Sequence, residues 1–252
     1  MSSKSLLREE NISRLVDYCT KGITNIPKEN IELMIHEHLS KSEDLEKSSE
    51  EIVSFARKVI QAEKLVNQEI GSNIAKNSII IIGPMGAGKT TVSQEIHKRN
   101  NMPLISLDDR NQLNDLYEET ERNGLKGKDA EFYLTARTLT SIKEPAIIVF
   151  GAGHGDYPNK TMETEMGVLL NKFPNIICLE YSENKEESLE VLNKRISQRK
   201  ENQDRTEQVF RDNEHFIYDS SFEAFAKKVI YTKDRTPEEV ADKVLDFVNT
   251  RQ

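Results

Sequence analysis

Residues 79–91 read IIIIGPMGAGKTT. The first four are a β-branched run without a polar position, which is typical of a strand buried on both faces of a parallel sheet. The next eight, Gly83–Thr90, match the pattern G-x-x-x-x-G-K-[ST] at every position. A helical run begins at Thr91, so the pattern lies between a strand and a helix, as a phosphate-binding loop does. This stretch therefore predicts a site for a nucleoside triphosphate.

The chemistry of the loop explains its residue types. Glycines let backbone N–H groups approach phosphate oxygens, and these groups stand at the N-terminus of the next helix, where an anion is favoured. Lys89 can reach the β- and γ-phosphates, and the Thr90 hydroxyl can bind the Mg²⁺ ion that bridges them. We expect ATP and Mg²⁺ as cofactors. The expected nucleotide-binding residues of the loop are Gly83, Met85, Gly86, Ala87, Gly88, Lys89, Thr90 and Thr91.

Further apolar runs predict a sheet of five strands. Strands alternate with helical stretches, which indicates βαβ units and a parallel sheet in an α/β protein of the P-loop NTPase fold. The four other predicted strands are residues 103–107, 146–150, 175–180 and 229–232. Helices are predicted at residues 92–98, 111–123, 130–142, 161–171, 188–200, 221–227 and 237–248.

The N-terminal part of the chain has a different pattern. Apolar stripes at helical spacing predict three helices, at residues 5–20, 27–39 and 48–70, with little linker beyond Gly71–Asn77. We therefore predict a helical N-terminal region, 1–75, followed by a P-loop domain, 76–252. No catalytic pattern is visible in the first region. We expect it to pack on the P-loop domain, with a homodimer or a regulatory partner as the alternatives.

Composition limits the classes of partner. The chain has 252 residues, 35 Lys and Arg against 43 Asp and Glu, and a net charge of -8. A broad nucleic-acid surface needs clustered basic residues, so no extended nucleic acid is expected. The two cysteines, Cys19 and Cys178, form neither a zinc spacing nor a disulfide framework. No apolar run approaches membrane-spanning length, so the chain is expected in the cytoplasm and away from membranes.

Asp108 and Asp109 follow the second predicted strand. Ligands of open α/β sheets bind at the carboxyl ends of the strands, where this pair is expected. One carboxylate could orient an acceptor hydroxyl, and the other could hold Mg²⁺ through water or pair with an arginine. The structural alternative is a helix N-cap, a position that Asp favours. We favour Asp108 as the base and as the magnesium-side carboxylate.

Three glycines, Gly151, Gly153 and Gly155, follow the third predicted strand. Glycine there permits close approach of a substrate, although a plain turn explains it equally well. His154 lies in the same loop, and a lone histidine is weak support for a role. No Asp follows the strand at 147–149, so a Walker B carboxylate is missing at that place.

Residues 76–252 resemble shikimate kinases and their relatives. The phosphate loop is the most specific similarity, and the other matches are in order and spacing. The matching stretches are IIIIGPMGAGKTT at 79–91, LDDR at 107–110, GKDAEFY at 127–133, IIVFGAGHG at 147–155, IICLEYSEN at 176–184 and the segment 220–248. The resemblance implies a small-molecule kinase, with Asp108, Arg110, Tyr133, Gly151 and Gly153 at the acceptor site.

The acceptor positions depart from that pattern. Tyr133 replaces the family's substrate arginine, Ala152 interrupts its triple glycine, and no second arginine is found near Ser220–Phe222. Those positions hold the shikimate carboxylate in the family, and a planar carboxylate without guanidinium groups loses its bidentate partners. Shikimate is therefore not the expected substrate.

An arginine-bearing lid is a further implication of the resemblance. Arg195, Arg199 and Arg205 lie in the segment KRISQRKENQDR, and the first two share one face of the predicted helix. In related kinases one such arginine flanks adenine, which we expect of Arg195. Others close over the phosphates, as we expect of Arg199 and Arg205, where cations would neutralise charge on the transferring group. A solvated charged helix is the alternative.

We thus expect ATP- and Mg²⁺-dependent transfer of the γ-phosphate to a hydroxyl of a small molecule. The stretch around Asp108 and Asp109 is also similar to polynucleotide kinases and to zeta-type toxin kinases, which phosphorylate a nucleotide sugar. Such an enzyme is the first alternative. An ATP-binding regulatory module without kinase turnover is the second, because a fold and a motif do not prove catalysis.

Overall fold

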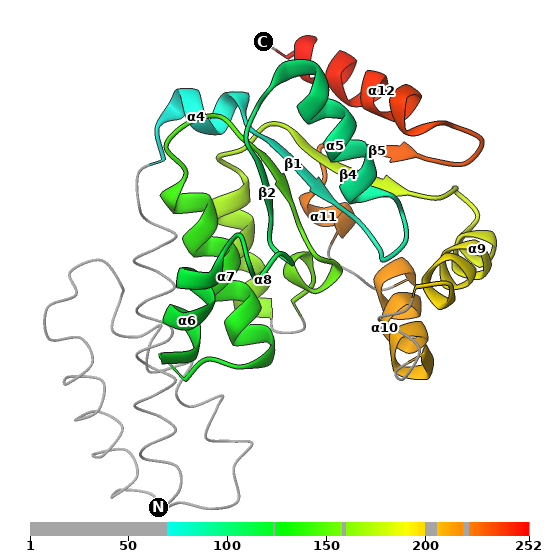
Figure 1. Cartoon of the computed structure of the whole chain (residues 1–252), viewed down its shortest axis with the longest axis horizontal. Helices are drawn as coiled ribbons and strands as arrows, with labels where there is room; N and C mark the ends of the chain where they lie inside the picture. The colour runs from blue at the N-terminus through cyan, green and yellow to red at the C-terminus, as the bar shows by residue number, and fades with distance from the viewer. Residues whose placement is uncertain (1–69, 123, 158–159, 200–205, 219–221, 252) are drawn as a thin grey trace, which may run out of the picture. The chain divides into compact units, whose positions relative to one another are not determined.

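The computed structural model describes residues 70–122, 124–157, 160–199, 206–218 and 222–251. The predicted N-terminal helices, Cys19 and Arg205 lie outside these residues. Whether 1–75 forms a separate region stays a prediction. Figure 1 shows the described part as coloured ribbon.

A sheet of five parallel strands forms the centre of the described part (Figure 1). Its order is β2-β3-β1-β4-β5, so the strand before the phosphate loop is central. Ile80 pairs with Ile148 of β3 on one side and with Ile176 of β4 on the other. The predicted α/β fold with five parallel strands is confirmed. The strands are β1 (Ile79–Ile82), β2 (Leu104–Ser106), β3 (Ile147–Val149), β4 (Ile176–Glu180) and β5 (Lys228–Tyr231).

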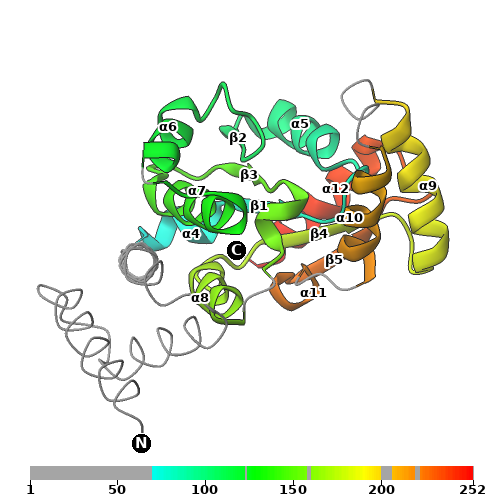
Figure 2. The same ribbon diagram turned by 90° about the horizontal axis from the view of Figure 1, so that it is seen from below.

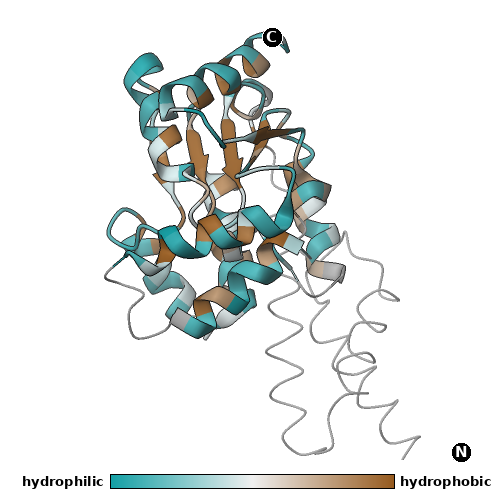
Figure 3. Cartoon of the chain, turned by 90° about the vertical axis from the view of Figure 1, so that its right-hand side faces the viewer, coloured by the Kyte–Doolittle hydropathy of each residue, from teal (hydrophilic) through white to brown (hydrophobic). Residues whose placement is uncertain are grey.

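Helices cover both faces of the sheet (Figure 2). Alternate residues of a strand face opposite sides of the sheet. Ile79 and Ile81 of β1 therefore belong to the hydrophobic core formed with α5 and α12, whereas Ile80 does not. The α7 and α8 helices lie on the other face. Burial on both faces explains why the central strand β1 and its neighbour β3 are uniformly apolar (Figure 3). The helices discussed so far are α5 (Lys89–Asn100), α7 (Gly127–Ser141), α8 (Lys160–Leu170) and α12 (Pro237–Asn249).

Other helices follow the predicted segments with shifted ends. Three elements were not predicted. They are α4, a short helix in the expected linker, α10, which follows the expected lid, and the 3₁₀ turn η1 in the expected glycine loop. The apolar residues Val209, Phe216 and Ile217 recur at helical spacing, so α10 was predictable, with the buried Asn213 as the polar member of its stripe. The remaining helices are α4 (Ser72–Asn77), α6 (Asn114–Arg122), α9 (Lys185–Ser197), α10 (Thr206–Tyr218), α11 (Phe222–Phe225) and the 3₁₀ turn η1 (Ala152–Gly155).

Two expectations from composition can be compared with the described residues. Cys178 is a free thiol with no exposed surface, as predicted for a small buried hydrophobe. Burial raises its pKa, and the nearby charge of Glu180 adds to that effect. Among the described residues, no helix combines the length and the apolar character that crossing a bilayer would require.

Candidate active site

The phosphate loop leaves β1 and enters α5 through backbone that only glycine adopts easily. Gly83 and Gly88 have φ angles of 134° and 95°. A Cβ atom on Gly83 would stand 2.2 Å from the Leu179 carbonyl oxygen, so β4 excludes any side chain there. Gly88 caps the N-terminus of α5, and a Cβ atom on it would meet nothing within 4 Å. The loop thus presents open space in front of a helix N-terminus, which favours an anion.

Lys89 places its ammonium over this loop. Its Nζ donates hydrogen bonds to the carbonyl oxygens of Gly83 and Pro84, at 2.8 and 2.9 Å. Burial lowers the pKa of Lys89 to about 8, and the charge of Asp108 works in the opposite direction. A desolvated cation beside free helical N–H groups fits a phosphate, whose negative charge would stabilise the ammonium. Thr90 follows in the first turn of α5 and is exposed, as the expected magnesium ligand must be.

The two aspartates after β2 differ in their surroundings. Asp109 Oδ1 accepts hydrogen bonds from the backbone N–H groups of Asn111 and Gln112, at 3.0 and 3.2 Å. It therefore closes the turn that leads to α6, as the capping alternative expected. The Asp108 side chain is 68% exposed, and its charge acts on Lys89. The structure thus places Asp108, rather than Asp109, next to the phosphate loop.

The loop after β3 packs against two carboxylates. A Cβ atom on Gly151 would lie 2.0 Å from Asp108 Oδ1, and one on Gly153 would lie 2.6 Å from Glu131 Oε1. The two carboxylates therefore occupy the space that a side chain at either glycine would fill, and they would have to turn aside for it. The Lys128 side chain contacts the same loop. Its Nζ donates to the Gly153 carbonyl oxygen at 3.0 Å and pairs with Glu131 Oε2 at 2.9 Å.

His154 lies inside this loop and is 6% exposed. Its Nδ1 has no hydrogen-bond partner within the described part of the chain, and it lies 3.5 Å from Asp108 Oδ1. Burial lowers the pKa of His154, while the charges of Asp108 and Glu131 oppose the shift. The Tyr157 hydroxyl donates to the His154 carbonyl oxygen at 2.5 Å and fixes the turn. A buried imidazole nitrogen therefore faces Asp108 beside the phosphate loop.

Two predicted acceptor-site residues have other contacts. Tyr133 donates its hydroxyl hydrogen bond to Glu119 of α6 at 2.5 Å, and burial together with this bond raises its pKa to about 12. Arg110 pairs with Glu121 at 2.5 Å and lies over the Tyr117 ring. The guanidinium of Arg110 is therefore engaged along α6.

The α9 and α10 helices bring further polar groups to the phosphate loop. Arg195 donates to the Gly86 carbonyl oxygen at 3.2 Å. The Met85 backbone N–H donates to Asn213 Oδ1 at 3.0 Å, and Asn213 has no exposed surface. Arg199 lies two residues beyond the end of α9, so the prediction that it shares a helical face with Arg195 is wrong. Its charge is still among those that lower the pKa of Lys89.

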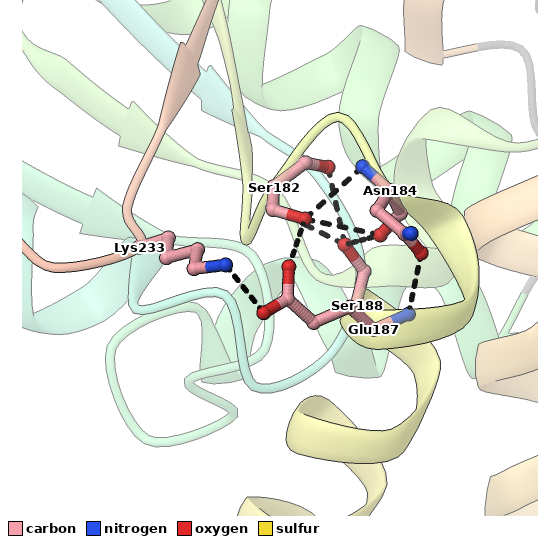
Figure 4. A network of polar contacts seen from close by, with 5 residues as sticks. All are labelled: Ser182, Asn184, Glu187, Ser188 and Lys233. Carbon is pink, nitrogen blue, oxygen red and sulfur yellow. Dashed lines mark hydrogen bonds and ion pairs between the residues drawn. The ribbon is translucent and has the colours of Figure 1, made fainter.

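A polar network fixes the start of α9 (Figure 4). Asn184 caps the helix by accepting from the Glu187 backbone N–H at 2.8 Å. The Glu187 side chain accepts from the Ser182 hydroxyl at 2.8 Å and pairs with Lys233, which follows β5, at 2.5 Å. The helix that bears Arg195 is thereby tied to the carboxyl ends of β4 and β5.

Several residues at the site were not identified from the sequence. Glu131 and Lys128 lie within GKDAEFY, in which Tyr133 was the predicted acceptor-site residue. Asp156 directly follows the glycine loop, and its Oδ2 lies 3.0 Å from His215 Nε2 of α10 and 3.7 Å from Lys128 Nζ. A carboxylate next to GAGHG was the available signal. No sequence pattern indicated a role for Asn213, because its partner is a backbone N–H group more than a hundred residues away in the chain.

No group of three or more His, Cys, Asp or Glu side chains suited to a metal ion occurs among the described residues. A Mg²⁺ ion usually keeps several waters and is held by one or two protein groups together with phosphates. Thr90 and Asp108 would supply those protein groups.

Comparisons with known proteins agree with the resemblance seen in the sequence. The model of the family described as AAA domain matches residues 79–215. A shikimate kinase of Enterococcus faecalis (strain ATCC 700802 / V583) is 29% identical over 179 residues, which cover 67% of this chain and 96% of that protein. The expected similarity to shikimate kinases is thus confirmed, and with it the assignment to the P-loop phosphotransferases.

Solved structures with a similar chain include two kinases. A shikimate kinase from Acinetobacter baumannii in complex with shikimate aligns with a TM-score of 0.49 and 17% identity, over 76% of this chain and 98% of that one. A gluconokinase from Sinorhizobium meliloti 1021 aligns with a TM-score of 0.46 and 16% identity, over 70% and 93% of the two chains.

Proposed function

This chain belongs to the AAA domain family, and on that premise we propose that it transfers the γ-phosphate of ATP, with Mg²⁺, to a hydroxyl of a small molecule other than shikimate. The observation that carries the proposal is the meeting of donor and acceptor groups at one edge of the sheet. Lys89 follows β1, Asp108 follows β2, and Gly151 follows β3. The Asp108 carboxylate acts on the Lys89 charge and packs on Gly151.

Each residue has a role that its surroundings favour. The loop amides and the Lys89 ammonium bind the triphosphate, and Mg²⁺ supplies positive charge that offsets the charge developing on the phosphates. Asp108 is exposed and has no capping role, so it orients the acceptor hydroxyl and receives its proton. Arg195 holds the Gly86 carbonyl beside the nucleotide, and Arg199 adds positive charge next to Lys89. Arg205 remains a proposed lid residue on its position in the sequence.

Transfer from γ-labelled ATP to a deproteinised metabolite extract tests the proposal. The wild type is expected to form a labelled product, while Lys89→Met loses it by at least about a hundredfold, because a charge that stabilises the transition state is removed. Lys76→Met, at an exposed lysine of α4, is the matched control and keeps full activity. Equal labelling by Lys89→Met and the wild type would rule the mechanism out.

The same assay separates the alternatives. A regulatory module binds ATP and yields no labelled product with any extract. A nucleotide-sugar kinase or a polynucleotide kinase yields a product that retains a nucleoside, which mass spectrometry identifies. The acidic net charge of the chain disfavours a long nucleic acid as acceptor.

A further inference from the structure

The acceptor side of the proposed site is acidic. Three carboxylates lie at or beside the glycine loop: Asp108 against Gly151, Glu131 against Gly153, and Asp156 directly after η1. Two ammonium groups accompany them: Lys128 pairs with Glu131 and Asp156, and Lys89, which is assigned to the triphosphate, interacts with Asp108. The charges that face the loop in the described part of the chain therefore sum to an excess of negative charge.

A buried group without a partner points to a ligand at this place. The Nδ1 atom of His154 has no hydrogen bond in the described part of the chain, although the residue is 6% exposed. Leaving such an atom unpaired costs about 1–3 kcal/mol, so it is normally satisfied by a partner. It lies 3.5 Å from Asp108 Oδ1, which is the carboxylate assigned to the acceptor hydroxyl. A turn of the exposed Asp108 side chain would open Nδ1 to a hydroxyl that the same carboxylate holds.

Two arginines, one close to Asp108 in sequence and one on the α7 helix that bears Glu131, are engaged with other carboxylates. Arg110 pairs with Glu121, and Arg137 pairs with Glu119. Recognition of a carboxylate or a phosphate usually depends on a free guanidinium fork. An anionic acceptor would have to displace one of these pairs and also approach Asp108 and Glu131, whose charges repel it.

We propose that the acceptor is a hydroxyl compound without negative charge, either neutral or carrying a protonated amine, and that Glu131 selects it over anionic compounds. Asp108 and His154 hold the hydroxyl that receives the phosphate. The Glu131 carboxylate, which lies against Gly153 of the glycine loop, binds a second hydroxyl or the amine. Transfer joins the acceptor oxygen to the γ-phosphorus, breaks the bond from that phosphorus to ADP, and moves the hydroxyl proton to Asp108.

This inference rests on the proposed kinase function, and one experiment distinguishes their failures. A deproteinised metabolite extract is separated by ion exchange into anionic, neutral and cationic fractions, and each is incubated with γ-labelled ATP and the full chain. Label is expected in the neutral or cationic fraction and absent from the anionic one, with Lys89→Met as the background. Label in the anionic fraction would overturn the charge selection and leave the kinase function standing. No label in any fraction would overturn the kinase function, and the charge selection with it.

A matched pair of variants tests the residue. Glu131→Gln keeps the shape of the side chain and removes its charge, so the half-saturating concentration of the labelled fraction is expected to rise roughly tenfold, while that of ATP stays unchanged. Glu144→Gln removes an exposed carboxylate before β3, at the opposite edge of the sheet, and is expected to behave as the wild type. Circular dichroism establishes that both variants are folded. Equal half-saturation in Glu131→Gln and Glu144→Gln would contradict the role of Glu131.

Discussion

Lys89 keeps its charge at a place where burial works against it. Its pKa falls to about 8, even though Asp108 lies close enough to oppose the shift. The free protein therefore begins to lose this ammonium slightly above neutral pH. A bound triphosphate favours the charged form and raises the pKa again.

From these two states we predict how ATP affinity changes with pH. Below pH 7 Lys89 is charged in both the free and the ATP-bound protein, so its ionisation does not make the affinity for ATP depend on pH. Above about pH 8 binding must also take up a proton, so the dissociation constant for ATP should rise by up to about tenfold per pH unit. Isothermal titration calorimetry between pH 6.5 and 9.5 measures this dissociation constant. The Lys89→Met variant should bind ATP weakly, and its dissociation constant should not rise with pH in this way. Parallel pH curves for the variant and the wild type would contradict the assignment of the pH dependence to Lys89.

At the residue scale, the sequence could locate the donor site and only half of the acceptor site. The glycine and lysine spacing of the phosphate loop depends on neighbours in the chain, so it could be identified directly. The sequence alone does not distinguish Asp108 from Asp109. Only the turn after β2 shows that the Asp109 carboxylate accepts hydrogen bonds from the backbone there. Glu131 reaches Gly153 from a different element, and no local pattern indicates such a contact.

At the element scale, α10 connects the two halves of the proposed site. Asn213 accepts a hydrogen bond from the Met85 N–H of the phosphate loop, and His215, two residues later, contacts Asp156 behind the glycine loop. Asn213 also donates to Asn193 of α9 at 3.1 Å. The helix that follows the expected lid is thus bonded to the donor side and to the acceptor side.

We predict that Asn213→Ala weakens ATP binding by roughly five- to tenfold, because a net hydrogen bond of about 1 kcal/mol to the loop is lost and a loop N–H is released. Gln208→Ala, on the same helix, is the control, since Gln208 is exposed and bonds Asp212 within the helix. Calorimetric titration with ATP checks both variants. Wild-type affinity in Asn213→Ala would show that this bond does not position the loop.

Elements with strong periodicity were predictable, and those defined by remote contacts were not. The strands β1, β3 and β4 follow from apolar runs because they are buried on both faces, whereas the edge strands β2 and β5 are only partly buried. The α10 helix has an apolar stripe and was predictable, but its sequence does not indicate that the buried Asn213 pairs with the phosphate loop. Likewise, the glycine-rich η1 turn depends on Tyr157 and on carboxylates from α7 and the β2 end, which its own sequence does not indicate.

At the scale of the whole molecule, the order of the strands assembles the site. Placing β1 between β3 and β4 brings the phosphate loop next to the glycine loop, and pairing β2 with β3 brings Asp108 to the same edge. The sequence predicts that the sheet is parallel, but it does not predict which strands are neighbours. The role of residues 1–75, as a packed extension or as a surface for a partner, stays a prediction.

Phosphoryl transfer by Asp108→Asn and Asp109→Asn is the most direct test that donor and acceptor groups meet at this edge. Both substitutions remove one charge, and Asn at 109 retains the oxygen that caps the turn. With γ-labelled ATP at saturation and the acceptor fraction from the metabolite extract, Asp108→Asn should lose roughly a hundredfold or more in rate, as for a removed general base. Asp109→Asn should stay within about threefold of the wild type, because capping acceptors are nearly interchangeable. A large loss in Asp109→Asn with an active Asp108→Asn would contradict the proposed site.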